Sequence, residues 1–284
     1  MFPNPQDALP LPVHPNVEQY RKQAKDLVKA CKSGDPEAMG AWAGQWIRTL
    51  ARLHGPALVP PSRARIERWV DQVKEFAQSK LCYPQAGSTK CTLADAQFVI
   101  ARAHGFQSWP KLRTHIEALA RVNSPVAQFE SAAEAIVTGD VPALERLLRE
   151  NSKLIRARST REHRANLLHY ISANGVESYR QKTPKNAVQV AETLLQAGAL
   201  VDAEADVYGG GTTTLGLVAT SVHPLRAGVQ NALMQLLLDH GAAIDHPQGA
   251  DNAQSIVRGA LGNGCPQAAE FLSHRGALLG LEEA

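Results

Sequence analysis

A nine-residue segment that occurs twice almost letter for letter limits the possible folds of this chain. Residues 194–202 read LLQAGALVD, and residues 237–245 read LLDHGAAID. Fainter copies lie at residues 147–152 and 272–277. In each copy an apolar pair ends a helix on its buried face, and the chain then turns at a residue that tolerates positive φ. We expect these turn residues to be Asn151, Gly198, Gly241 and Gly276. A unit repeated in this way is typical of a solenoid.

The N-terminal part of the chain shows no such repeat and predicts a separate helical domain. Five prolines within residues 3–16 predict an extended arm. Asn16 is placed to cap a first helix, and Thr92 with Asp95 forms a capping box for a later one. Helical spacing of apolar residues predicts further helices in between and one after Ser108. We predict a helical domain with a Pro-rich arm over residues 1–122 and the repeats over residues 123–284.

Composition excludes several functional classes. The chain has 284 residues with 30 basic and 27 acidic side chains, a net charge of +3. This bias is too weak to indicate nucleic acid as a partner, and no apolar run is long enough to span a membrane. The N-terminus lacks a basic segment followed by an apolar one, so no signal peptide is predicted.

The four cysteines predict reduced thiols in a cytoplasmic protein. None of them forms a C-x-x-C pair, and Cys82 and Cys91 have no further ligands nearby for zinc. A bridge between Cys82 and Cys91 is the alternative. We therefore expect no metal and no cofactor.

The repeated region resembles the ankyrin-repeat family. Residues 166–171, NLLHYI, stand where that family has its T-P-L-H-x-A motif, and the LLxxGA segments stand at the end of the outer helix. Residues 14–27 (HPNVEQYRKQAKDL) and 94–112 (ADAQFVIARAHGFQSWPKL) resemble the N-terminal helical region of bacterial ankyrin-repeat proteins. The resemblance implies an all-α fold with about four ankyrin repeats behind a helical domain. It also implies that His169 ties one repeat to the next rather than acting in catalysis.

Two of the repeats are longer than the family's period of about 33 residues. The turn residues 151, 198, 241 and 276 are separated by 47, 43 and 35 residues. The extra chain falls at residues 176–186 and 222–230, and stacked repeats would bring these insertions side by side. Residues 206–214, with three consecutive glycines, form a further irregularity at a hairpin.

Candidate binding residues follow from these irregular segments and from one basic loop. Cations in the first hairpin, including Arg161 and Arg164, and in the first insertion could contact an acidic partner or ligand, although solvated surface charge is the simpler interpretation. Backbone N–H groups of the glycine run could hold an anion, although a flexible hairpin tip is the simpler interpretation. The candidates are Arg161, His163, Arg164, Tyr179, Arg180, Gln181, Lys182, Asp206, Tyr208, Gly209, Gly210 and His223.

Three functions remain open at this level. The first is a cytoplasmic scaffold that binds another protein through its repeats, with no catalytic residues. The second is a small-molecule-binding protein or enzyme whose site lies in the insertions, with Arg180, Tyr208 and His223 converging. The third, nucleic-acid binding, is disfavoured by the modest charge. The tryptophans at 42, 46, 69 and 109 could stack on a ligand, but their helical spacing favours core packing.

Overall fold

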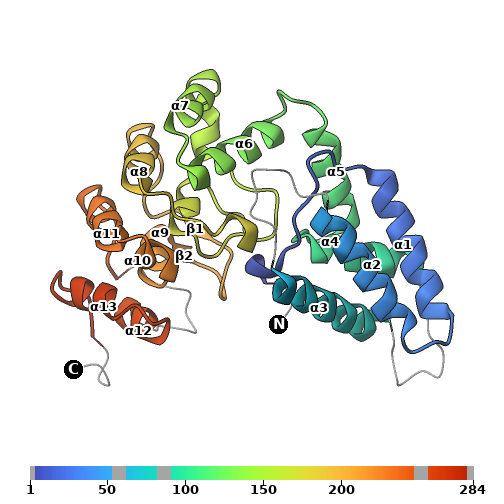
Figure 1. Ribbon diagram of the computed structural model, residues 1–284. Helices are drawn as coiled ribbons and strands as arrows, with labels where there is room; N and C mark the ends of the chain where they lie inside the picture. The colour runs from blue at the N-terminus through green and yellow to red at the C-terminus, as the bar shows by residue number, and fades with distance from the viewer. Residues whose placement is uncertain (1–3, 53–61, 82–90, 246–254, 280–284) are drawn as a thin grey trace. The chain divides into compact units, whose positions relative to one another are not determined.

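The computed structural model describes residues 4–52, 62–81, 91–245 and 255–279 (Figure 1). Its contacts divide the chain into two compact units, Met1–Ser124 and Pro125–Ala284. Helices dominate both units, and one short two-stranded hairpin occurs among the described residues. The predicted all-α class is therefore confirmed at this level. Within the described residues, no helix is both long and apolar enough to cross a bilayer.

The described residues of the first unit form a bundle of five α-helices preceded by the short 3-10 helix η1 (Pro5–Asp7). The helices α1 and α2 contact each other, α2 packs on α3, and α4 contacts α1, α3 and α5. Their bounds are α1 Val17–Lys32, α2 Ala38–Arg52, α3 Arg63–Leu81, α4 Leu93–Ala103 and α5 Trp109–Leu119.

The N-caps predicted at Asn16 and Thr92 are confirmed. The side chain of Asn16 accepts a hydrogen bond of 2.8 Å from the Glu18 N–H at the start of α1. Thr92 and Asp95 exchange the reciprocal hydrogen bonds of a capping box at the start of α4. These caps satisfy N–H groups that a helix cannot pair internally, which is why the sequence alone locates the helix starts.

The core of the first unit includes most of the tryptophans. Trp42, Trp46 and Trp69 are buried, and Trp109 packs against this core from a half-buried position. The core packing favoured for these side chains is therefore confirmed.

A disulfide joins α1 to the start of α4 in the first unit. It links Cys31 with Cys91, which are 60 residues apart. The expectation of reduced thiols is wrong for these two residues, and Cys91 is not paired with Cys82, which lies outside the described residues. The two sulfurs meet because α1 packs against α4. The spacing of the cysteines along the chain does not indicate this long-range packing.

The second unit consists of short helices arranged in successive pairs. Its α-helices are α6 Pro125–Thr138, α7 Val141–Glu150, α8 Ala187–Gln196, α9 Thr214–Ala219, α10 Val222–Arg226, α11 Gln230–Asp239, α12 Ile256–Gly262 and α13 Pro266–Ser273. The 3-10 helices are η2 Ser152–Arg156, η3 Leu168–Ser172 and η4 Ser178–Arg180. The strands β1 (Glu204–Ala205) and β2 (Thr212–Thr213) pair antiparallel.

The pairs contact one another in two rows. One row runs through α7, α8, α11 and α13, and the other runs through α6, η3, α9 and α12. Each member of one row also contacts its partner in the other row, and Figure 1 shows the successive pairs along the second unit. A single apolar core extends through the unit from Phe129 to Ala277.

Three of the four predicted turn residues have positive φ. Gly198, Gly241 and Gly276 have φ of 92°, 86° and 86°. Asn151 has φ of −144°, so the prediction of positive φ is wrong there. Its side chain instead accepts a hydrogen bond from the Lys153 N–H and starts η2, which makes a left-handed turn unnecessary.

The NLLHYI motif itself forms the single 3-10 helix η3 rather than a longer inner helix. Ala173 ends it with φ of 49°, and Gly175 follows with φ of 67°. A Cβ at Gly175 would lie 3.0 Å from Leu217 and 3.1 Å from Val207. The two predicted insertions contain η4 and α10.

Candidate functional site

Two buried arginines of the second unit converge on one glutamate of α6. The two Oε atoms of Glu130 take one arginine each: Oε1 lies 2.5 Å from Nη1 of Arg161, and Oε2 lies 2.7 Å from Nη1 of Arg180. Glu177 adds a second carboxylate, with Oε1 2.9 Å from Nε of Arg161. We call Glu130, Arg161, Glu177 and Arg180 the ionic cluster.

Local turns of the chain direct these side chains inward. A bridge between Arg158 and Asn166 closes the first hairpin, and the Ser159 N–H donates to the Ala165 carbonyl over 2.8 Å. Arg161 lies inside this loop. The insertion contributes Glu177 and Arg180 through η4, in which the Arg180 N–H donates to the Glu177 carbonyl over 2.8 Å.

Aromatic and imidazole rings surround the ionic cluster. The Arg180 guanidinium lies 5.8 Å from the ring centroid of Tyr170 and 5.6 Å from that of Tyr179. Nη2 of Arg161 donates to the Tyr179 hydroxyl over 3.2 Å. Nδ1 of His163 accepts from the Ala165 N–H, so its Nε2 carries the proton that points to Glu177, 3.3 Å away.

The cluster keeps its charges although its side chains are largely buried. Burial by itself disfavours a charged Arg161, but the attractions of Glu130, Tyr179 and Glu177 together outweigh it and raise the pKa above its usual value. Burial likewise disfavours a charged Glu177, but Arg161, His163 and Arg180 together hold the pKa of that carboxyl well below its usual range. Glu130 and Glu177, together with Glu134 at 3.8 Å from Arg180, therefore neutralise the positive charge that would attract an anionic ligand.

The cluster brings together only part of the predicted set. Arg161 and Arg180 belong to it, and His163 and Tyr179 contact it. Arg161 was expected as a surface cation of a basic loop, and this is wrong, because its side chain is 2% exposed against Glu130 and Glu177. The amide of Gln181 is directed to its own insertion, where Nε2 donates to the Val176 carbonyl over 2.9 Å.

Other predicted residues lie outside the cluster. Arg164 is exposed with φ of 52°, Lys182 and His223 are half-buried, and Asp206 is exposed. The Asp206 N–H donates to the His163 carbonyl over 2.8 Å and so joins two successive hairpins.

Polar groups of the glycine-rich hairpin form hydrogen bonds with other groups of the protein. The Tyr208 hydroxyl donates to Oδ1 of Asn174 over 2.7 Å, although the side chain is 54% exposed. The Gly210 N–H donates to the Val207 carbonyl over 2.9 Å, and Gly209 is exposed beside it. Arg180 thus lies in the ionic cluster, and the Tyr208 hydroxyl bonds to Asn174. These positions do not support a pocket shared by Arg180, Tyr208 and His223.

Sequence reasoning missed Glu130, Tyr170 and Glu177. Glu177 precedes Arg180 by three residues within the predicted insertion, so a carboxylate partner for that arginine was visible there. Glu130 lies 31 residues before Arg161 on another element, and no local pattern indicates their contact. Among the described residues, no group of three or more His, Cys, Asp or Glu side chains is placed to hold a metal ion.

No family model matches this chain, and no curated protein matches it.

Proposed function

We propose that this chain is a non-catalytic scaffold whose second unit is an ankyrin-type repeat stack that binds another protein. The observation that carries the proposal is a contact repeated in register between successive units. The carboxylate of Asp202 accepts from the Ala243 N–H over 3.1 and 3.2 Å. The carboxylate of Asp245 accepts in the same way from the Leu278 N–H over 3.0 and 3.1 Å.

Both contacts join equivalent positions of the repeated segment. Each aspartate lies four residues after its turn glycine, and each N–H lies two residues after the next turn glycine. Repeats that tie to their neighbours identically form a stiff array, and a stiff surface spends little ordering entropy on binding. The buried His169 bonds with Asn166 at the start of the NLLHYI motif, so this contact fixes the motif within its own repeat.

The hairpins of this unit offer a basic surface for an acidic partner. Arg156 and Arg164 are exposed. Arg158 lies between them and donates from Nη1 to the carbonyls of Arg164 and Glu204, over 3.0 and 2.5 Å, so it holds two hairpins together. Arg156 and Arg164 are therefore the cations that remain available to a partner, and the ionic cluster beneath supplies rigidity.

Affinity capture from the native host with identification by mass spectrometry tests the scaffold. We expect a captured protein to be lost with the double variant Arg156→Glu and Arg164→Glu. The control Arg146→Glu reverses an equally exposed charge on α7 and should retain it. An identical set of captured proteins for all three chains would contradict the proposal, as would retention of nucleic acid that falls steeply with salt.

A location in the cytoplasm is part of this proposal. The expectation of a cytoplasmic location rested on reduced thiols. The Cys31–Cys91 disulfide removes that support, because disulfides are typical of oxidising compartments. Fractionation of the native host would test the location directly.

A further inference from the structure

The first unit has a groove between α1 and α2 that consists of two adjoining hollows. One hollow has a volume of about 200 Å³ and is lined by residues from Pro12 to Leu50. The other has a volume of about 490 Å³ and is lined by residues from Lys22 to Gln45. Lys22 and Gln23 line both, so the hollows are continuous along α1.

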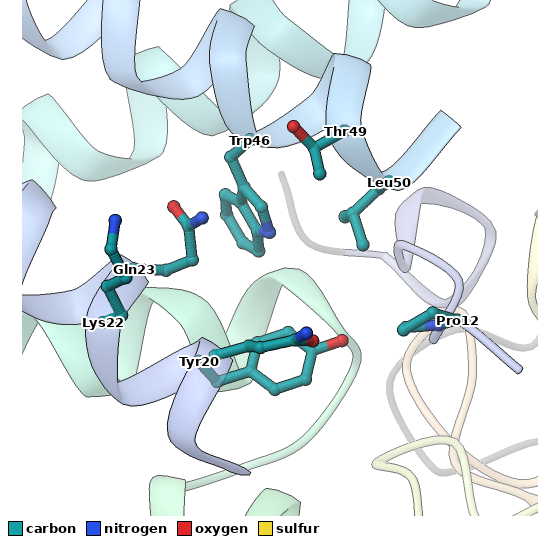
Figure 2. A pocket seen from close by; sticks show the side chains of 8 residues that line it. Pro12, Tyr20, Lys22, Gln23, Trp46, Thr49 and Leu50 are labelled. Atoms are coloured by element: carbon teal, nitrogen blue, oxygen red, sulfur yellow. The ribbon is translucent and has the colours of Figure 1, made fainter. Parts of the chain in front are cut away.

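One end of the groove is apolar and aromatic. Figure 2 shows the indole of Trp46 from α2 and the phenol ring of Tyr20 from α1 on opposite sides of the hollow, with Pro12 and Leu50 at its end. The ring of His104 packs edge-on against both, with centroid distances of 5.0 Å to Tyr20 and 5.6 Å to Trp46. The buried imidazole fixes both rings, so this end is preformed for one apolar side chain.

Side-chain amides lie along the groove. Gln19 and Gln23 are one helical turn apart on α1, and Gln45 faces them from α2. The Trp42 indole N–H donates to the backbone carbonyl of Gln23 over 3.2 Å and holds α2 against α1 there. Each glutamine amide both donates and accepts, as the backbone N–H and C=O groups of an extended peptide require.

The rim of the groove is net positive. Lys22 and Lys29 line it together with one acidic residue, Asp26. Asp26 pairs with Lys22 over 2.9 Å, which leaves one positive charge in excess. An acidic ligand complements this rim.

The length of the groove indicates a chain-like ligand. Its lining residues run along α1 from Gln19 to Ser33. At a rise of 1.5 Å per residue this is about 20 Å, which matches about six residues of extended peptide. We propose that the α1–α2 groove binds an extended acidic peptide segment of a partner protein, with one apolar residue at the end lined by Pro12, Tyr20, Trp46 and Leu50. This inference does not depend on the hairpin surface of the second unit.

Fluorescence anisotropy with the full chain and a labelled synthetic peptide tests the groove. The probe has about eight residues, enough to span the groove, with Pro-Leu at its centre and glutamates on both sides. Three variants of exposed residues separate the contributions. Lys22→Glu with Lys29→Glu reverses the rim, Thr49→Arg fills the mouth of the aromatic end while adding positive charge, and Lys25→Glu changes an α1 lysine that does not line the groove.

We expect saturable binding by the unsubstituted chain. The double lysine variant and Thr49→Arg should each weaken it by about tenfold or more, about 1.4 kcal/mol. Lys25→Glu should change it by less than about twofold, because a solvated charge beside the site contributes little. A probe with alanines in place of Pro-Leu should also bind about tenfold more weakly.

Three results would overturn the inference. The first is no saturation by about 1 mM peptide, which corresponds to a binding free energy of about −4 kcal/mol. The second is an equal loss of binding in Lys25→Glu, and the third is unchanged binding by Thr49→Arg. Phosphatidylserine vesicles provide a separate titration. If they bind with the same dependence on Lys22 and Lys29 while the peptide does not, the groove recognises a lipid surface instead.

Discussion

Oε1 of Glu177 lies 2.9 Å from Nε of Arg161, and neither side chain has more than 2% of its surface exposed. The contact joins the first hairpin to the insertion that follows η3. Because Arg161 also contacts Glu130, it connects three segments of the second unit. The positions of these segments therefore depend on a charge pair that water does not screen.

Removal of Glu177 should destabilise the second unit strongly. In Glu177→Ala the buried Arg161 loses a counter-charge but stays charged, which costs about 3–5 kcal/mol of unfolding free energy. Urea unfolding followed by circular dichroism measures this change. The matched control is Glu117→Ala, which removes one partner of the exposed Arg113–Glu117 pair and should cost less than about 1 kcal/mol. Equal losses of unfolding free energy in the two variants would show that the buried pair stabilises the protein no more than the exposed pair does.

Acid should weaken the fold through His169 before it affects the ionic cluster. Burial and the nearby charge of Arg158 lower the pKa of His169 to about 4. In the unfolded chain the imidazole titrates near pH 6.5, so below that pH the unfolded state binds more protons and stability falls. The loss should reach about 3 kcal/mol by pH 4. The pKa of Glu177 is also lowered, and its contribution is lost only as the pH falls below about 4.5.

Urea unfolding between pH 7 and pH 4.5 measures the His169 effect. His169→Gln removes the titrating group, and its stability should decline less over this interval than that of the unsubstituted chain, whatever its stability at pH 7. Parallel declines in the two proteins would assign the acid sensitivity to other residues.

Reduction of the Cys31–Cys91 disulfide should destabilise the first unit. The bond closes a loop of 60 residues, and loss of this constraint on the unfolded chain corresponds to about 4 kcal/mol in the chain-entropy model. Unfolding of the double variant Cys31→Ser and Cys91→Ser gives the same comparison without reductant. Cys265→Ser serves as a control for loss of a buried sulfur outside the bond. If reductant leaves unfolding unchanged, the two thiols are not bonded in solution.

The helix starts at Asn16 and Thr92 could be predicted from sequence because each cap joins residues no more than three positions apart. The glycine turns at 198, 241 and 276 were equally accessible, since positive φ is a property of the single residue. The aspartates of the repeated segment were visible as letters, but their bonds to Ala243 and Leu278 appear only when the next unit is in place.

Which of the cations are buried and which are exposed could not be predicted from sequence. Arg161 and Arg164 lie in one basic loop, yet one is buried in the ionic cluster and the other is exposed. The difference arises from Glu130, which α6 brings to Arg161 from 31 residues away. Trp46 is a similar case. Its helical spacing indicates a place in the core, whereas its position beside the α1–α2 groove depends on the packing of two helices.

The sequence by itself determined the helical class, the helix caps of the first unit and the glycine turns of the repeated segment, because each rests on interactions between near neighbours along the chain. Only the tertiary structure decided that Arg161 and Arg180 face Glu130, that Cys31 bonds with Cys91 and that a groove opens between α1 and α2. Burial and Coulomb attraction depend on distance in space, and these partners meet only when helices far apart in sequence have packed.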